Sequence, residues 1–114
     1  MRMRTTILAI LIAALALPAF AQNGDAARGK ELFMQVGCWQ CHGRAGQGGG
    51  YTGPKLAPDP PPLAVIQAYV RHPTGDMPPY SEKVISNAGL ADIRAFLLTI
   101  PKPPSPKTLP GLTR

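Results

Sequence analysis

Three features are missing from this chain of 114 residues, and each absence excludes a class of protein. The longest apolar run reaches 15 residues, from Ile7 to Ala21, whereas a helix that spans a bilayer needs about 20. Lysines and arginines are scattered along the chain without interleaved aromatics, which argues against nucleic-acid binding. No segment alternates between apolar and polar residues as a half-buried strand does. The sequence therefore predicts an all-α protein that binds no nucleic acid.

The first residues have the layout of a secretory leader. Two arginines in "MRMR" precede the apolar run Ile7–Leu17, and a small-x-small pattern follows at residues 19–21. This order predicts a signal peptide over residues 1–21, cleaved after Ala21, and an uncleaved membrane anchor is the weaker alternative. We expect a periplasmic protein that has no integral membrane span after cleavage.

Cleavage would leave a short chain with little material for a core. Removal of 21 residues leaves 93, of which 13 are proline and 12 glycine, and the formal charge falls from +6 to +4. A protein-only core of this size is marginal, and such chains commonly need a disulfide, a metal or another staple. We therefore expect the hydrophobic core to include an apolar group that the polypeptide does not supply.

The first predicted helix begins after Asp25, a favourable N-cap, and ends at Gly37. Its apolar side carries Gly29, Leu32, Phe33 and Val36 at helical spacing. A loop of 20 residues follows, from Gly43 to Pro62. So long a loop in a small domain is usually functional, and we expect it to wrap around something. The loop opens with the glycine-rich stretch "GRAGQGGG", for which the sequence suggests only flexibility.

Two more helices are expected before a proline-rich end. One is predicted to start near Asp59, with Pro60 at its first position, and to stop before Pro73. The stretch "SEKVI" favours a short turn of helix. The next helix is capped by Ser86, is stopped by Pro101, and carries an apolar face of Leu90, Ile93, Leu97 and Ile100. We predict one domain over residues 22–101 and a polyproline-like or disordered tail over 102–114.

The chain's only two cysteines stand in the motif Cys38-Trp39-Gln40-Cys41-His42. A zinc site would need two further ligands, and the chain has one other histidine, His72, and no third cysteine. A thioredoxin-like dithiol belongs to an α/β pattern, and this chain shows no strands. The third interpretation is covalent attachment of a c-type haem, for which C-x-x-C-H is the signature.

The spacing of the motif suits haem attachment. Cysteines three positions apart lie on one helical turn, where both sulfurs can form thioethers to one edge of a porphyrin. The adjacent histidine then offers a nitrogen to the iron. The haem would also supply the missing apolar mass. We predict one covalent haem c, bound by Cys38 and Cys41, with His42 as the proximal iron ligand.

From these residues the chain resembles the small class I, single-haem bacterial cytochromes c over roughly residues 24–101. The resemblance implies a cytochrome c fold with three main helices and long loops wrapped around one haem. It also implies that the Pro54 carbonyl accepts the other N–H of His42 and that Met77 is the distal ligand. The matching positions are Gly29 and Phe33, the cysteine motif, "GPKL" at 53–56, "MPPY" at 77–80, and "LADIRAFL" with Phe96.

The distance along the chain from the cysteine motif also indicates which residue is the sixth iron ligand. Met34 lies four residues before Cys38, too close to pass around the ring. Met77 stands 35 residues after His42 and is followed by two prolines that stiffen its loop. His72 is the rival, with a surface position at a helix C-terminus as its simpler explanation. We predict Met77.

Ligation by histidine and methionine closes both axial positions and raises the reduction potential, which favours one-electron transfer over catalysis. The predicted function is therefore electron transfer between redox proteins, without enzymatic activity. The alternative is a haem enzyme or gas-binding protein with an open distal site, for which Arg71 and His72 are the nearest polar pair. The resemblance implies partners such as an exported dehydrogenase, of which the protein is an acceptor or subunit, or a terminal oxidase.

Overall fold

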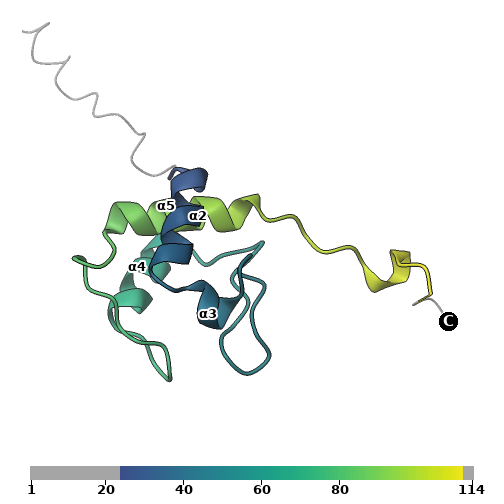
Figure 1. Ribbon diagram of the computed structural model, residues 1–114, viewed down its shortest axis with the longest axis horizontal. Helices are drawn as coiled ribbons and strands as arrows, with labels where there is room; N and C mark the ends of the chain where they lie inside the picture. The colour runs from purple at the N-terminus through teal and green to yellow at the C-terminus, as the bar shows by residue number, and fades with distance from the viewer. Residues whose placement is uncertain (1–23, 112–114) are drawn as a thin grey trace, which may run out of the picture.

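The computed structural model describes residues 24–111 (Figure 1). The predicted signal peptide, residues 1–21, lies outside this range. The helices are α2 (Ala26–Gln35), α3 (Trp39–His42), α4 (Leu63–Arg71), α5 (Asn87–Thr99) and the short 3₁₀ helix η2 (Pro106–Thr108). Over the described range the chain forms no strand, apart from one isolated bridge between Gly49 and Gly53. The predicted all-α class is confirmed.

The helix ends follow from local chemistry, as the sequence predicted. The Asp25 side chain accepts hydrogen bonds from the backbone N–H groups of Ala27 and Arg28, which satisfies donors left free at the start of α2. Gly37 follows the end of α2 with φ +86°, a conformation that glycine adopts without steric cost. The Ser86 hydroxyl caps α5 by accepting from the Gly89 N–H. Pro101 stands directly after the C-cap of α5, Ile100.

The start of α4 differs from the prediction. The helix begins at Leu63 with Pro62 as its N-cap, not near Asp59. Three consecutive prolines explain the delay, because each residue that precedes a proline is pushed out of helical geometry. The guanidinium of Arg94 on α5 also holds this segment, since its Nε donates to the Pro61 carbonyl at 2.9 Å. The end of α4 before Pro73 was predicted correctly.

Two shorter segments behave differently from regular helices. In "SEKVI" the N–H groups of Val84 and Ile85 both donate to the Ser81 carbonyl, which makes a turn rather than a helix. The C-terminal segment runs away from the helices, as Figure 1 shows in yellow. It contains η2, which was not predicted and which the Ser105 hydroxyl caps by accepting from the Lys107 N–H.

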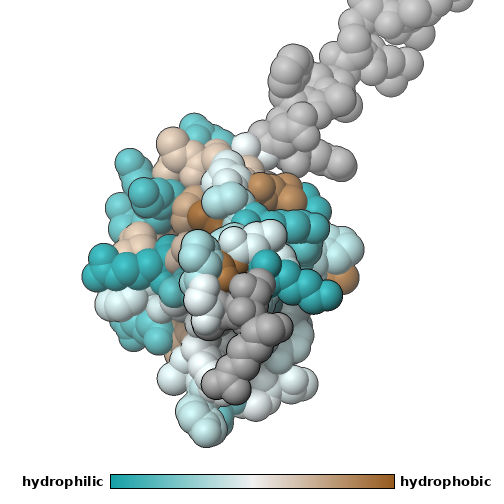
Figure 2. All heavy atoms as spheres, turned by 90° about the vertical axis from the view of Figure 1, so that its right-hand side faces the viewer, coloured by the Kyte–Doolittle hydropathy of each residue, from teal (hydrophilic) through white to brown (hydrophobic). Residues whose placement is uncertain are grey.

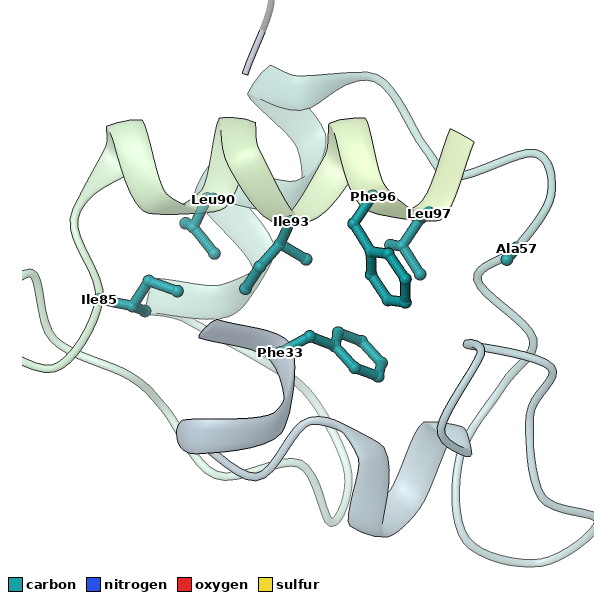
Figure 3. Packing of buried hydrophobic residues seen from close by; sticks show 7 residues of the cluster. All are labelled: Phe33, Ala57, Ile85, Leu90, Ile93, Phe96 and Leu97. Atoms are coloured by element: carbon teal, nitrogen blue, oxygen red, sulfur yellow. The ribbon is translucent and has the colours of Figure 1, made fainter. Parts of the chain in front are cut away.

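The core forms where α2 crosses α5. Phe33 of α2 is fully buried, and its ring lies 5.6 Å from that of Phe96, centroid to centroid, at an interplanar angle of 56° (Figure 3). Gly29 permits the close approach, because a methyl group there would collide with the backbone of Asp92. The buried cluster consists of Phe33, Ala57, Ile85, Leu90, Ile93, Phe96 and Leu97.

A buried carboxylate fixes the same crossing at its outer end. Asp92 on α5 accepts from the backbone N–H of Asp25 at 2.7 Å, and Arg28 approaches the other carboxylate oxygen at 3.4 Å. The face of the molecule in Figure 2 is largely hydrophilic, with hydrophobic residues in small, separate patches. Among residues 24–111, none of the helices combines the length and apolar character needed to cross a membrane.

Candidate functional site

The cysteine motif lies on the short helix α3, directly after the turn at Gly37. Cys38 is the N-cap residue of α3, and Cys41 and His42 form its last two positions. Both thiols are free; Cys41 is exposed, whereas Cys38 is partly buried. His42 is buried, with 8% of its surface exposed. The structure therefore places the two sulfurs one helical turn apart, with a buried imidazole beside them.

A hydrogen bond sets the protonation of His42. Its Nδ1 lies 2.8 Å from the carbonyl oxygen of Pro54. A carbonyl oxygen can only accept, so Nδ1 carries a proton, and in the neutral ring Nε2 keeps a free lone pair. Such a bond to the second nitrogen fixes the ring and raises the basicity of a histidine ligand. The contact between Pro54 and His42 that the resemblance implied is present.

The glycine-rich loop packs against α3. The Gly48 N–H donates to the His42 carbonyl at 2.7 Å, and the Thr52 hydroxyl donates to the Cys41 carbonyl at 2.9 Å. These bonds satisfy carbonyls that the short helix leaves free. A methyl group on Gly53 would stand 2.8 Å from the Cys41 oxygen and 3.1 Å from Nδ1 of His42. Close packing around the histidine therefore explains why glycine stands at this position.

One cavity of about 520 Å³ brings the predicted site residues together. Its walls come from all four α-helices and from the loops between them, and they include Cys38, Cys41, His42 and Met77. Most of the remaining wall is apolar, including Phe33, Leu56, Ile66, Tyr69 and Leu97. Leu63 lies outside this wall and packs against the core cluster.

The three candidates for a second ligand are placed differently. Met77 is partly buried and lines the cavity. His72 is exposed and stands outside the cavity wall, at the C-cap of α4. Met34 packs against the core cluster and also does not line the cavity. Of these three, only Met77 shares the cavity with His42.

Burial weakens the acidity of two groups at the cavity. Desolvation raises the pKa of the Cys38 thiol to about 11, so this thiol remains protonated at neutral pH. A protonated thiol is a poor nucleophile, which does not suit a redox dithiol. Burial also raises the pKa of Tyr80, and negative charge on Cys38 and Cys41 adds to that effect. Conversion of both thiols to thioethers would remove the charges but not the burial.

Sequence reasoning missed the role of Arg71. Its guanidinium donates to the carbonyls of Tyr80 and Ile85 and to the side-chain oxygen of Asn87. It does not line the cavity, and neither does His72. The only indication of this role in the sequence is that Arg71 is the last residue of α4, just before the loop that carries Met77. Its acceptors lie 9 to 16 residues away in sequence, which no local pattern indicates.

Comparison with known proteins identifies the group to which the chain belongs. A family model described as cytochrome c oxidase, cbb3-type, subunit III, matches residues 24–97. The chain belongs to this family of c-type cytochromes. The matched range covers the cysteine motif, the cavity walls and nearly all of α5. Membership places this cytochrome among haem c proteins that transfer electrons, not among enzymes.

One curated relative is the cytochrome bc1 complex cytochrome c subunit of Corynebacterium efficiens. It is 34% identical over 84 residues, which cover 72% of this chain and 28% of the relative. The cytochrome thus spans little more than a quarter of that protein's length. No solved structure matches the chain.

The residues around the cavity fit the haem of a c-type cytochrome. The cavity volume lies within the range of about 300–1,000 Å³ that is usual for cofactor and ligand sites, and the wall is mostly apolar. Cys38 and Cys41 would hold the group through thioethers, Nε2 of His42 has a free lone pair, and Met77 offers a soft sulfur. This donor set is compatible with haem c.

Proposed function

We propose that this chain is an exported, periplasmic cytochrome c that binds one haem and carries single electrons between redox proteins. The observation that carries the proposal is the shared cavity, which Cys38, Cys41, His42 and Met77 all line. When bound, the haem supplies a one-electron iron couple. One haem per chain is proposed because the C-x-x-C-H motif occurs once in the sequence.

The protein's own residues hold and tune that group. Cys38 and Cys41 anchor it covalently, while Pro54 keeps Nδ1 of His42 protonated and directs Nε2 to the iron. Met77 is proposed as the second axial ligand, which would raise the reduction potential and leave no position for substrate. Helices α2, α4 and α5 and the loops between them would then wrap around the haem, since all of them contribute to the cavity wall.

An open-site haem enzyme is disfavoured by the positions of Arg71 and His72. A peroxidase-like site needs polar groups that handle protons beside the distal face. The Arg71 guanidinium is already bonded to three acceptors, and the His72 side chain is exposed. Neither residue lines the cavity.

The proposed partners are other exported or membrane-bound redox proteins. The leader pattern supports a periplasmic location. The family description and the relative's name refer to a terminal oxidase and to a bc1 complex, which favours a respiratory complex as one partner. An exported dehydrogenase is proposed as the electron donor. Encounters of this kind use small, transient interfaces of less than about 1,200 Å².

The test is to produce the full chain in a bacterium that attaches haem c and to fractionate the cells. We expect the protein in the periplasmic fraction, with one haem per chain and a low-spin ferric spectrum typical of two strong axial ligands. A Cys41→Ser variant should lose the thioether at that position. A high-spin ferric spectrum would contradict closed axial positions, and retention in the cytoplasm would contradict export.

A further inference from the structure

The segment that carries Met77 forms a closed loop. The Tyr80 N–H donates to the Val70 carbonyl at 2.9 Å, so residues 71–79 leave the end of α4 and return to it. The Tyr69 hydroxyl on α4 lies 3.0 Å from both oxygens of Thr74 in the loop. Tyr69 is 43% exposed, so water competes with these two contacts.

The stronger constraint on the loop is the Arg71 guanidinium. One of its terminal nitrogens donates to the Tyr80 carbonyl at 2.9 Å. The other donates to the Ile85 carbonyl at 2.8 Å and to Oδ1 of Asn87 at 3.0 Å. Asn87 is the first residue of α5, and its amide reaches Glu82 at 3.3 Å. One planar group therefore joins the end of α4, the exit of the Met77 loop and the start of α5.

The chemistry of this contact requires arginine. A guanidinium holds its donors in a rigid fork, and hydrogen bonds from a charged donor are stronger than neutral ones. Its Nε is buried and has no partner within residues 24–111, a desolvation cost that the three other bonds must offset. A lysine ammonium has a single nitrogen and cannot span carbonyls of two residues in the same geometry.

We propose that Arg71 is the positioning residue for Met77. By holding the carbonyls of Tyr80 and Ile85, it keeps the loop in the one arrangement that presents the Met77 sulfur to the cavity. Tyr80 and Ile85 line the same cavity, so a shift of their backbone also moves its wall. When the loop is preorganised, the Met77 sulfur would be bound to the iron in a larger fraction of molecules than when the loop is mobile, because no free energy is lost in ordering it. The inference rests on the proposed function, in which Met77 is the distal ligand.

The test compares Arg71→Met and Arg71→Lys with a matched control, Arg94→Met. Arg94 is also a partly buried arginine that donates to a loop carbonyl, that of Pro61, and within residues 24–111 it forms no hydrogen bond to the Met77 loop. Four properties of each holoprotein are measured: the thioether-to-iron absorption of the ferric form, the rate of carbon monoxide binding to the ferrous form, the midpoint potential and the thermal unfolding midpoint.

We expect Arg71→Met to bind carbon monoxide at least about tenfold faster than the wild type, because the open form becomes more populated. Its potential should fall and its thioether absorption should weaken, and Arg71→Lys should lie between it and the wild type. Arg94→Met should lower the unfolding midpoint alone. If the Arg71→Met holoprotein does not accumulate, Arg71→Lys is compared with Arg94→Lys. Only Arg71→Lys should then show faster carbon monoxide binding and a lower potential.

Two results would overturn the inference, and they are distinguishable. If the Arg71 variants lose thermal stability but keep the wild-type potential and carbon monoxide rate, Arg71 is only a structural residue and Met77 ligation stands. If the wild type itself binds carbon monoxide as readily as Met77→Ala, Met77 is not a ligand, and the proposed function fails together with the inference.

Discussion

Met77 and His72 stand five residues apart on the same loop, yet only Met77 lines the cavity. The difference has a local cause. His72 is the C-cap residue of α4 and has an exposed side chain. Met77 lies between the Tyr69–Thr74 contact and the point where Tyr80 returns to Val70. At the scale of single residues, loop closure therefore selects which side chain meets the cavity.

Substitution of Met77 should change the haem properties, whereas substitution of His72 should not. Met77→Ala should lower the reduction potential, because the thioether is a ligand that raises it. It should also raise the apparent affinity for carbon monoxide by about tenfold or more, since the sixth position is no longer occupied. His72→Ala, the control, should change neither. Redox titration and carbon monoxide binding check this, and a shift of potential in the His72 variant alone would reverse the assignment.

At the scale of elements, the crossing of α2 and α5 is the contact on which the core depends. Gly29 and Gly89 are both buried helical glycines, one on each helix, but their surroundings differ. A methyl group at Gly29 would meet the rigid backbone of Asp92 and Ile93. At Gly89 it would meet the side chains of Ile85 and Leu32 at 3.1 and 3.3 Å.

Gly29→Ala should lower the free energy of unfolding by about 1–3 kcal/mol, as overpacking does, although alanine is the better helix former. Gly89→Ala should stay within about 1 kcal/mol of the wild type, because side chains can yield where backbone cannot. Denaturant unfolding of the two holoproteins measures the difference. Equal stability of the two variants would show that the helices can separate without cost.

The whole molecule encloses a cavity that is large for so small a core. Within residues 24–111, eight hydrophobic residues are buried, and they lie beside a cavity of about 520 Å³ with a mostly apolar wall. A space of this size lined by apolar groups is costly to leave unfilled or wet. The haem is therefore expected to be part of the core, which a chain of this length cannot complete alone.

The double variant Cys38→Ala with Cys41→Ala, which cannot attach haem, should consequently remain largely unfolded. Circular dichroism during heating should show little helix and no cooperative transition, whereas the wild-type holoprotein should unfold cooperatively. A cooperative transition of the double variant near the wild-type midpoint would contradict the prediction that the cofactor completes the core.

The proline-rich tail lies beyond the part of the chain that the family model matches, which ends at Leu97. Residues 101–108 are exposed, and an ion pair of 3.7 Å between Lys102 and Asp59 joins the base of the tail to the domain. An extended proline segment loses little entropy when a partner orders it, which favours a role in recognition.

Deletion of residues 103–114 keeps Lys102 and should leave the spectrum and potential unchanged. Reduction by the dehydrogenase proposed as electron donor, if it is isolated by pull-down with the holoprotein, should slow by about tenfold for each 1.4 kcal/mol of binding free energy lost. Stopped-flow kinetics at several ionic strengths measure this. Equal rates for the full and shortened chains at every ionic strength would remove the tail from the reaction.

Much of the fold could be predicted because its causes are local. Asp25 and Ser86 cap helices through bonds to residues two or three positions away, and Pro73 and Pro101 limit the helices before them. The start of α4 was predicted wrongly although its cause is local too, since the three prolines act on the residues that precede them. Pro60 would suit the first position of a helix, but Pro61 and Pro62 after it exclude helical geometry there.

The sequence by itself determined the all-α class, the attachment motif and the order of the proposed ligands, because residue type and spacing carry that information. Only the tertiary structure decided why Gly53 is glycine and what Arg71 does. Gly53 is constrained by the Cys41 oxygen and the His42 ring, and Arg71 by acceptors 9 to 16 residues further along the chain. Such contacts exist only after the chain has closed on itself, because the path of the loops, and not the neighbouring residues, brings the partners together.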